Sequence, residues 1–337
     1  MIEGIILAIG AGLMLGLYAL PEKFTKDFKF ENTWGLFFML TMFLVPIVAS
    51  LTLIDGFSEV FAAVPSDILI KMALASVLWG IGVMMWGKAI NHIGLSLGFS
   101  LFIGTVILVG SVLPFLVEGL PEQQVFLTVL AGILVVLLGV LFNGRAGILR
   151  EQDELKSGDK KAENGGMVKG ITIAVVGGLL ATGFSYANAV GRPFIHEASQ
   201  AAGNPEWVTA VGVMFPIFIS GGIVMATYFA WQLSAKKAWA DFKTPNFSKN
   251  FILILVMAVF HYAASALFAF AAFKLGEIGN TVGYAIFNTS CVATAIVSGI
   301  VTNEWANASN KAKNFLYISL ASMIVGIVII ALGNGIA

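Results

Sequence analysis

Ten stretches of about 20 predominantly apolar residues recur along the chain, and polar segments separate most of them. The hydrocarbon core of a bilayer is about 30 Å thick, so a helix needs about 20 such residues to cross it. Only helices and closed barrels satisfy all backbone hydrogen bonds in lipid, and these runs have helical length. The sequence therefore predicts an all-α integral membrane protein. The predicted spans are 4–20, 34–54, 67–90, 94–117, 123–142, 167–190, 206–231, 249–273, 279–301 and 314–334.

The composition excludes a soluble globular protein. Hydrophobic residues make up 58% of the chain and charged residues 11%, whereas soluble domains carry about 25% charged residues. The formal net charge is zero, so no basic surface for nucleic acid is indicated. Three histidines and a single cysteine, Cys291, exclude a zinc cluster or an internal disulfide framework. We expect lipid around the spans and neither a metal nor another cofactor.

Lysine and arginine are distributed unevenly once the loops are assigned alternately to the two sides of the membrane. One side holds 16 of the 19 basic residues, and the other holds Lys71, Arg192 and Lys274. Cytoplasmic loops carry the excess of Lys and Arg, so the rich side is predicted to be cytoplasmic. Both termini then lie outside the cytoplasm, and the long hydrophilic segment 143–166 lies inside. We expect a multi-pass protein of the cell (inner) membrane.

Two segments of the chain resemble each other at an offset of 185 residues. Ile93–Phe102 aligns with Ile278–Phe287, at the start of the fourth and ninth spans. A weaker match aligns Gly12 with Gly178, in the first and sixth spans. After five crossings the chain is on the other side of the membrane, so a second unit of five spans has the opposite orientation. Such inverted repeats recur in secondary transporters. Chance similarity between glycine-rich packing helices is the alternative.

The predicted domain organisation is two inverted five-helix repeats, residues 1–142 and 167–337, joined by a cytoplasmic linker, residues 143–166. No enzyme motif competes with this interpretation. Gly82–Ala89 nearly fits a phosphate-binding loop, but its last position is Ala89, where the loop needs a hydroxyl group for magnesium. We therefore predict that the protein is not an enzyme.

Five short motifs stand out along the chain: Glu31-Asn32-Thr33-Trp34, Leu78-Trp79-Gly80-Ile81-Gly82, His92-Ile93-Gly94-Leu95-Ser96-Leu97-Gly98, Arg192-Pro193 with His196-Glu197-Ala198, and Glu304-Trp305-Ala306-Asn307-Ala308. Together they resemble a known family, the L-rhamnose–proton symporters of the drug/metabolite transporter superfamily, and the resemblance covers nearly the whole chain. It implies ten helices in two inverted repeats, with spans 1–4 and 6–9 around a central cavity and spans 5 and 10 at the periphery. It also implies proton-driven sugar uptake.

His261 is the sharpest single candidate, because polar groups at bilayer depth are costly unless they are paired or wet. It lies about midway between Asn246 and Lys274, hence near the bilayer midplane. Imidazole titrates near neutral pH, which suits a proton carrier, and it can also bind a sugar hydroxyl. A neutral histidine bonded to a neighbouring helix is the alternative. By contrast, we expect His196 and Glu197 in the outer loop after span 6, where they would be solvated; a proton relay at the entrance is the alternative.

Polar side chains also recur on one face of spans 6 and 9. Residues that follow one another at intervals of three or four lie on one face of a helix. Amide, hydroxyl and phenol groups are those expected to converge on a sugar, whereas interhelical hydrogen bonding is the alternative. We predict that four of the six residues named below, Ser185, Asn188, Tyr284 and Asn288, bind substrate. Arg192 is predicted to anchor or gate the outer mouth. The residues are Ser185, Asn188 and Arg192 of span 6, and Asn280, Tyr284 and Asn288 of span 9.

Four aromatic residues complete the predicted substrate site. Trp79 and Trp86 are seven residues apart and share a face of span 3. Trp79 is predicted to stack on the apolar face of a sugar, whereas Trp86, near the cytoplasmic end, also fits an interfacial aromatic belt. Tyr18 ends span 1, and Tyr262 follows His261 in span 8; both are counted with the substrate-binding residues.

The leading functional hypothesis is a secondary active transporter that takes up a small sugar, L-rhamnose or a related monosaccharide, with a proton. Transport would proceed by alternating access. Two alternatives stay open: sodium-coupled sugar uptake, and an exporter or exchanger of another small polar metabolite. A sensor or scaffold would carry a soluble module, and the longest loop has only about 24 residues. A homodimer through the peripheral spans 5 and 10 is the protein partnership considered.

Overall fold

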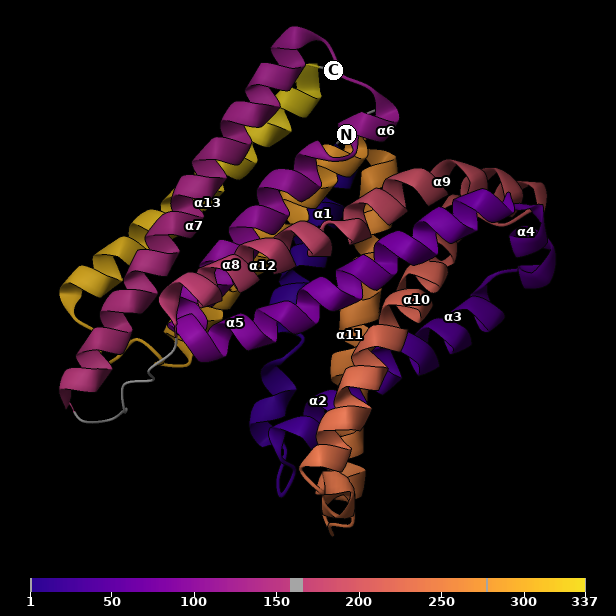
Figure 1. The fold of residues 1–337 in the computed structure, drawn as a ribbon. Coiled ribbons are helices and arrows are strands. Elements are labelled where there is room, and N and C mark those ends of the chain that lie inside the picture. The colour runs from indigo at the N-terminus through magenta and orange to yellow at the C-terminus, as the bar shows by residue number, and fades with distance from the viewer. Residues whose placement is uncertain (1, 158–165, 277, 337) are drawn as a thin grey trace.

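The computed structural model describes residues 2–157, 166–276 and 278–336. Within these ranges the chain is helical and contains ten segments long and apolar enough to cross a membrane, which confirms the predicted fold class. α1 begins and α13 ends at the same end of the bundle (Figure 1). The helices are α1 (Ile2–Leu17), η1 (Leu20–Phe24), α2 (Phe30–Met39), η2 (Leu40–Leu44), α3 (Val45–Leu53), α4 (Phe57–Ala63), α5 (Ser66–Val112), α6 (Phe115–Glu118), α7 (Gln123–Ser157), α8 (Met167–Ala181), α9 (Gly183–Ala201), α10 (Glu206–Ala235), η3 (Ala238–Phe242), α11 (Phe247–Lys274), α12 (Gly279–Val301) and α13 (Asn310–Ile336).

The 47-residue helix α5 contains predicted span 3 and most of span 4. Two apolar segments, Ser66–Ile90 and Leu97–Glu118, are each sufficient to cross a membrane, and the second continues into α6. A Cβ atom on Gly98 would lie 3.5 Å from the backbone nitrogen of Ile90. Residues eight apart in a straight helix are about 12 Å apart along its axis. The chain therefore folds back on itself here, and the prediction of two spans is confirmed.

Two helices extend further than the sequence predicts. α9 continues to Ala201, so the expectation that His196 and Glu197 lie in a loop is wrong, because both lie on this helix. The apolar run marks the part in lipid, whereas the helix itself ends only where Gly203 adopts a positive φ of 81°. α7 likewise continues to Ser157, so residues 143–157 of the predicted linker are helical.

α7 and α13 pack against each other at one side of the bundle, apart from most other helices (Figure 1). Glycines allow the close approach. A Cβ atom on Gly132 would lie 3.1 Å from the carbonyl oxygen of Gly326, and one on Gly326 would lie 2.9 Å from that of Gly132. Small residues at such contacts are typical of helices packed in membranes. These helices are the predicted peripheral spans 5 and 10.

Matched positions of the two halves make equivalent contacts. α1 packs on α12, and α8 packs on α5. A Cβ atom on Gly12 would lie 2.6 Å from the carbonyl oxygen of Phe287, and one on Gly178 would lie 2.9 Å from that of Phe102. The two glycines, and likewise the two phenylalanines, are aligned positions of the sequence repeat. The same pair of positions thus joins the first half to the second in both directions.

Two asparagine clamps join loops of the first half to the second half, one from the first turn of α11 and one from the loop between α9 and α10. At one end of the bundle, buried Asn250 accepts a hydrogen bond from the Lys26 backbone nitrogen at 3.1 Å and donates to the Lys26 carbonyl at 2.7 Å. At the other, buried Asn204 accepts from the Asp55 backbone nitrogen at 2.8 Å and donates to the Asp55 carbonyl at 2.9 Å. Each clamp satisfies two backbone groups of an irregular segment.

Candidate functional site

His261 lies in the middle of α11, enclosed by side chains from three other membrane segments. Its Nδ1 atom is 3.1 Å from the hydroxyl oxygen of Thr41, on η2. Its ring centroid is 5.0 Å from that of Tyr18, 5.5 Å from that of Phe37 and 5.6 Å from that of Phe218. These neighbours are neutral, so the surroundings favour a neutral imidazole that exchanges hydrogen bonds.

Aromatic rings connect His261 to α9 and α12, the two helices that carry the other predicted polar residues. Phe218 contacts Tyr262 at 5.0 Å and Trp79 at 5.6 Å between ring centroids. Trp79 in turn lies 5.2 Å from Phe184, which lies 6.3 Å from Tyr284. Tyr18, His261, Tyr262, Trp79 and Tyr284, all predicted site residues, thus lie along one chain of contacts inside the bundle.

The predicted polar residues of α9 and α12 lie together and are buried. Ser185 donates a hydrogen bond to the Gly110 carbonyl at 2.6 Å, and Gly110 itself packs against the Tyr284 ring. Asn288 donates to the Tyr284 carbonyl at 2.9 Å. Ser185, Tyr284 and Asn288 are each at most 6% exposed. These three side chains come from two helices of the second half, and Gly110 on α5 brings the first half into contact with them.

A second polar network, called the outer network because its end of the bundle is predicted to lie outside the cytoplasm, joins Asn188 to a carboxylate. Asn188 donates a hydrogen bond to the Asn280 side-chain oxygen at 2.5 Å. Asn280 donates to Glu118 Oε1, which also lies 3.4 Å from an Arg192 Nη2 atom. The Glu118 and Arg192 side chains are each 17% exposed. Gly119 has a φ of 89° and ends α6 directly after Glu118, which fixes the carboxylate at the end of the fourth span.

Trp86 lies apart from this arrangement. Its ring stacks at 5.7 Å on Phe102 and lies 5.9 Å from Phe99, both on the returning part of α5. Its indole nitrogen is buried without a hydrogen-bond partner among the described residues. A role for Trp86 in substrate binding stays a prediction, whereas its packing role between spans 3 and 4 follows from these contacts.

The sequence prediction omits Glu118 and Thr41. An arginine inside an apolar span requires an anionic or strongly polar partner, so Arg192 gives a usable signal. Glu118 directly follows the predicted fourth span, at the outer end to which Arg192 also belongs. Thr41 gives no such signal, because threonine in a helix commonly bonds its own backbone instead.

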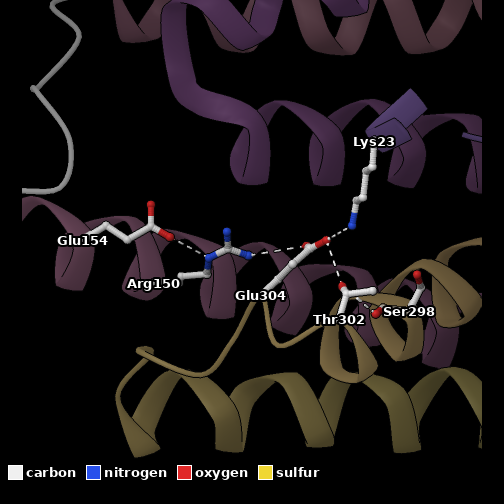
Figure 2. Close-up of polar contacts among 6 residues, drawn as sticks. All are labelled: Lys23, Arg150, Glu154, Ser298, Thr302 and Glu304. Atoms are coloured by element: carbon white, nitrogen blue, oxygen red, sulfur yellow. Dashed lines mark hydrogen bonds and ion pairs between the residues drawn. The ribbon is translucent and has the colours of Figure 1, made fainter. Parts of the chain in front are cut away.

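An inner network joins three polar segments at the opposite end of the bundle (Figure 2). Lys23 Nζ lies 2.8 Å from Glu304 Oε1, and Arg150 Nη1 lies 4.0 Å from Glu304 Oε2. Arg150 also pairs with Glu154 at 2.7 Å and lies 5.2 Å from the Trp305 ring centre. The hydrogen bond from Lys23 holds the pKa of the Glu304 carboxyl below its ordinary value. Two residues of one sequence motif thus fasten the loop before α13 to α7.

Among the described residues, no group of three or more His, Cys, Asp or Glu side chains is placed to hold a metal ion. The polar groups of the two regions are amides, hydroxyls, phenols, one imidazole and one ion pair. Such groups bind an uncharged, hydroxyl-rich ligand by hydrogen bonds, while the aromatic rings offer apolar faces.

Comparison with known proteins gives a consistent family match. A family model described as L-rhamnose-proton symport protein (RhaT) matches residues 1–336. Proteins named L-rhamnose-proton symporter from Escherichia coli and Klebsiella pneumoniae are each 26% identical, over 96% of this chain and 95% of the relative. A protein of that name from Shigella boydii serotype 18 has the same identity and coverage. The match therefore extends over nearly the full length of both partners.

Proposed function

This chain belongs to the L-rhamnose-proton symport protein family, and we propose that it takes up a small sugar together with a proton. The resemblance inferred from the five motifs is confirmed by the family match. The observation that carries the proposal is the buried series of polar and aromatic side chains between the two halves. These side chains suit a sugar, which presents hydroxyl groups at its rim and apolar faces. No enzymatic step is needed for uptake.

L-rhamnose is the sugar that the names of the relatives favour. It carries several hydroxyl groups and a methyl group. Asn188, Ser185, Tyr284 and Asn288 would bind hydroxyl groups, because their side chains both donate and accept hydrogen bonds. Trp79 would offer a ring face, and Tyr18 and Tyr262 would border the site on the side of His261.

The transport cycle proposed is alternating access between two inverted repeats, residues 1–142 and 167–337. The matched contacts of Gly12 and Gly178 support this relation. The Lys and Arg distribution supports termini outside the cytoplasm, linker 143–166 inside, and a cell inner membrane location. Large leucines on α7 would face lipid or a second copy of the chain; they are Leu134, Leu138 and Leu141.

The direct test is a radiolabelled sugar panel on proteoliposomes with imposed proton or sodium gradients. An inward proton gradient should drive accumulation of L-rhamnose, and collapse of that gradient by a protonophore should abolish it. Sodium-dependent uptake that is insensitive to pH would contradict proton coupling. Gradient-driven uptake of an unrelated metabolite instead of any sugar would favour the exporter or exchanger hypothesis.

His261 is proposed to carry the proton or to bind the sugar, and one variant separates these roles. His261→Ala should reduce proton-driven uptake of L-rhamnose by at least about tenfold, because a polar group inside the site is lost. His196→Ala, on the outer part of α9, is the matched control. If His261→Ala still shows sugar-induced alkalinisation at the wild-type rate, the coupling role is excluded. Loss of counterflow as well would indicate sugar binding.

A further inference from the structure

The outer network contains two buried polar atoms that find no hydrogen-bond partner among the described residues. They are the Asn188 side-chain oxygen and an Arg192 Nη1 atom. Asn188 is 0% exposed. Buried polar groups are normally bonded, since leaving one unpaired costs about 1–3 kcal/mol. One atom accepts and the other donates, so a hydroxyl-bearing ligand can satisfy both.

The other polar atoms of these two side chains lead to Glu118, from Arg192 directly and from Asn188 through Asn280. The Glu118 Oε1 atom receives the Asn280 amide and pairs with Arg192, and Asn280 in turn holds Asn188. A carboxylate accepts charge-assisted hydrogen bonds, which are about twice as strong as neutral ones. While Glu118 is ionised, the donors of Asn280 and Arg192 are directed at the carboxylate and are withheld from another ligand.

We propose that Glu118 binds the transported proton and that its protonation releases Arg192 and Asn280 to bind sugar hydroxyl groups. The inference rests on the proposed function. The proton comes from the solution outside the membrane and forms an O–H bond at the carboxylate, while the pair with Arg192 breaks. When the sugar leaves on the cytoplasmic side, the Glu118 O–H bond breaks, the proton passes to water of the inward-facing cavity, and the pair with Arg192 forms again. Proton and sugar then each raise the affinity for the other.

The position of the network fits this role. The 17% exposure of Glu118 and Arg192 leaves the pair within reach of water yet largely desolvated. A cavity of about 10 Å³, room for about one water, borders Arg192 together with Thr209 and Phe273. Asn188 continues the network one helical turn deeper, next to the predicted sugar-binding residues of α9. The proton site and the sugar site therefore share side chains.

The surrounding charged and titratable groups leave Arg192 as the direct partner of Glu118. The residue contributed by α12 is the neutral Asn280. Glu206 on α10 borders the same small cavity as Arg192, but it pairs with Lys274 on α11 at 2.8 Å. His196 lies about one turn beyond Arg192 on α9, with Nδ1 3.1 Å from the Thr209 hydroxyl. His261, by contrast, is surrounded by neutral side chains, so the proposal assigns the proton to Glu118 and leaves His261 the role of binding the sugar.

The test is Glu118→Gln in proteoliposomes, with L-rhamnose as the probe and two readouts. The amide keeps the size of the side chain but cannot exchange a proton. We expect sugar-induced alkalinisation to fall at least about tenfold, while L-rhamnose counterflow stays within about threefold of wild type and loses its pH dependence. Glu206→Gln, a paired carboxylate on the same side, should keep both activities.

Three outcomes would overturn the assignment: alkalinisation by Glu118→Gln at the wild-type rate, the same loss in Glu206→Gln, or loss of counterflow together with alkalinisation. Should the single variant fail to insert, Glu118→Gln combined with Arg192→Gln removes both charges, which is better tolerated than an unpaired one. Alkalinisation by this double variant would overturn the proposal too. If wild type itself shows no sugar-induced pH change, the proposed function fails instead.

Discussion

The outer and inner networks use the same chemistry in different surroundings. In both, a glutamate at or after the end of a span pairs with a basic residue far away in the chain. Glu118 and Arg192 are each 17% exposed, whereas Glu304 and Lys23 are 41% and 48% exposed. The outer pair continues through two amides toward the predicted sugar site. The inner pair instead continues to Thr302 and, through Arg150, to Glu154 on α7 (Figure 2).

This difference in burial separates two roles for an ion pair. An exposed pair contributes only about 0–1 kcal/mol, because water and salt screen it. A largely buried pair is costly to break on one side only, since the remaining charge loses its partner. The outer network can therefore transmit a protonation event to its neighbours, whereas the inner network serves to fasten loops.

The largest expected effect comes from breaking the outer pair. Arg192→Gln should lower the free energy of unfolding by about 3 kcal/mol, the low end of the range for buried pairs, because the pair keeps some contact with water. Lys23→Gln at the inner network should cost about 1 kcal/mol or less, because its pair with Glu304 is exposed. Thermal unfolding of both variants in one detergent measures the difference. Equal losses would remove the distinction between the networks.

The asparagine clamps test whether the two ends act in opposition. Asn204→Ala and Asn250→Ala each remove two hydrogen bonds to the loop of the first half that they hold, so each should cost about 1–2 kcal/mol. Asn204→Ala also removes a longer bond to the Ser199 carbonyl, at 3.3 Å. Their effects on transport should be opposite. Asn204→Ala loosens the clamp at the end predicted to lie outside the cytoplasm, so it should raise the sugar affinity measured from outside. A shift of about 1.4 kcal/mol toward the outward-open state would raise this affinity by up to about tenfold.

Asn250→Ala loosens the clamp at the opposite end, so it should raise the sugar affinity measured from the cytoplasmic side by a similar factor. Right-side-out and inside-out vesicles provide the two measurements. If both variants shift affinity on the same side, the clamps do not oppose each other in an alternating-access cycle, and the comparison of the two ends would need revision.

The smallest expected effect concerns Glu304. Its pKa is lowered in the folded protein, chiefly by the hydrogen bond from Lys23. The stabilisation is therefore fully present above the unfolded pKa of about 4.3 and is lost as pH falls through the folded pKa. Glu304→Gln should destabilise the protein by less than about 1 kcal/mol at pH 7 and by less in high salt, and the difference should disappear once the pH is below the folded pKa. A difference that grows toward low pH would contradict the sign.

The spans could be predicted from the sequence because a helix must have a minimum number of apolar residues to cross lipid. This criterion identified two spans even within the continuous helix α5. Helix ends could not be predicted equally well, since α9 and α7 continue beyond their apolar runs. The end of the apolar run and the end of the helix are set by different residues. In α9 the helix ends only near Gly203, which has a positive φ. Inversion of the two halves stays a prediction, supported by the matched contacts of Gly12 and Gly178.

The polar candidates could be predicted because any buried polar side chain in a span stands out. Their partners could not. The contact of His261 with Thr41, and the chain from Asn188 through Asn280 to Glu118, join residues that are 92 or more positions apart. Such contacts depend on how helices are arranged in space, and local sequence patterns carry no information about that arrangement.

The pH dependence of L-rhamnose affinity is the most direct test of proton binding at Glu118. Wild-type protein should lose affinity by up to about tenfold for each pH unit above the titration of Glu118, because one proton is linked to one sugar. Affinity should be independent of pH in Glu118→Gln and should keep the wild-type slope in Glu304→Gln. The same slope in all three proteins would contradict a proton site in the outer network.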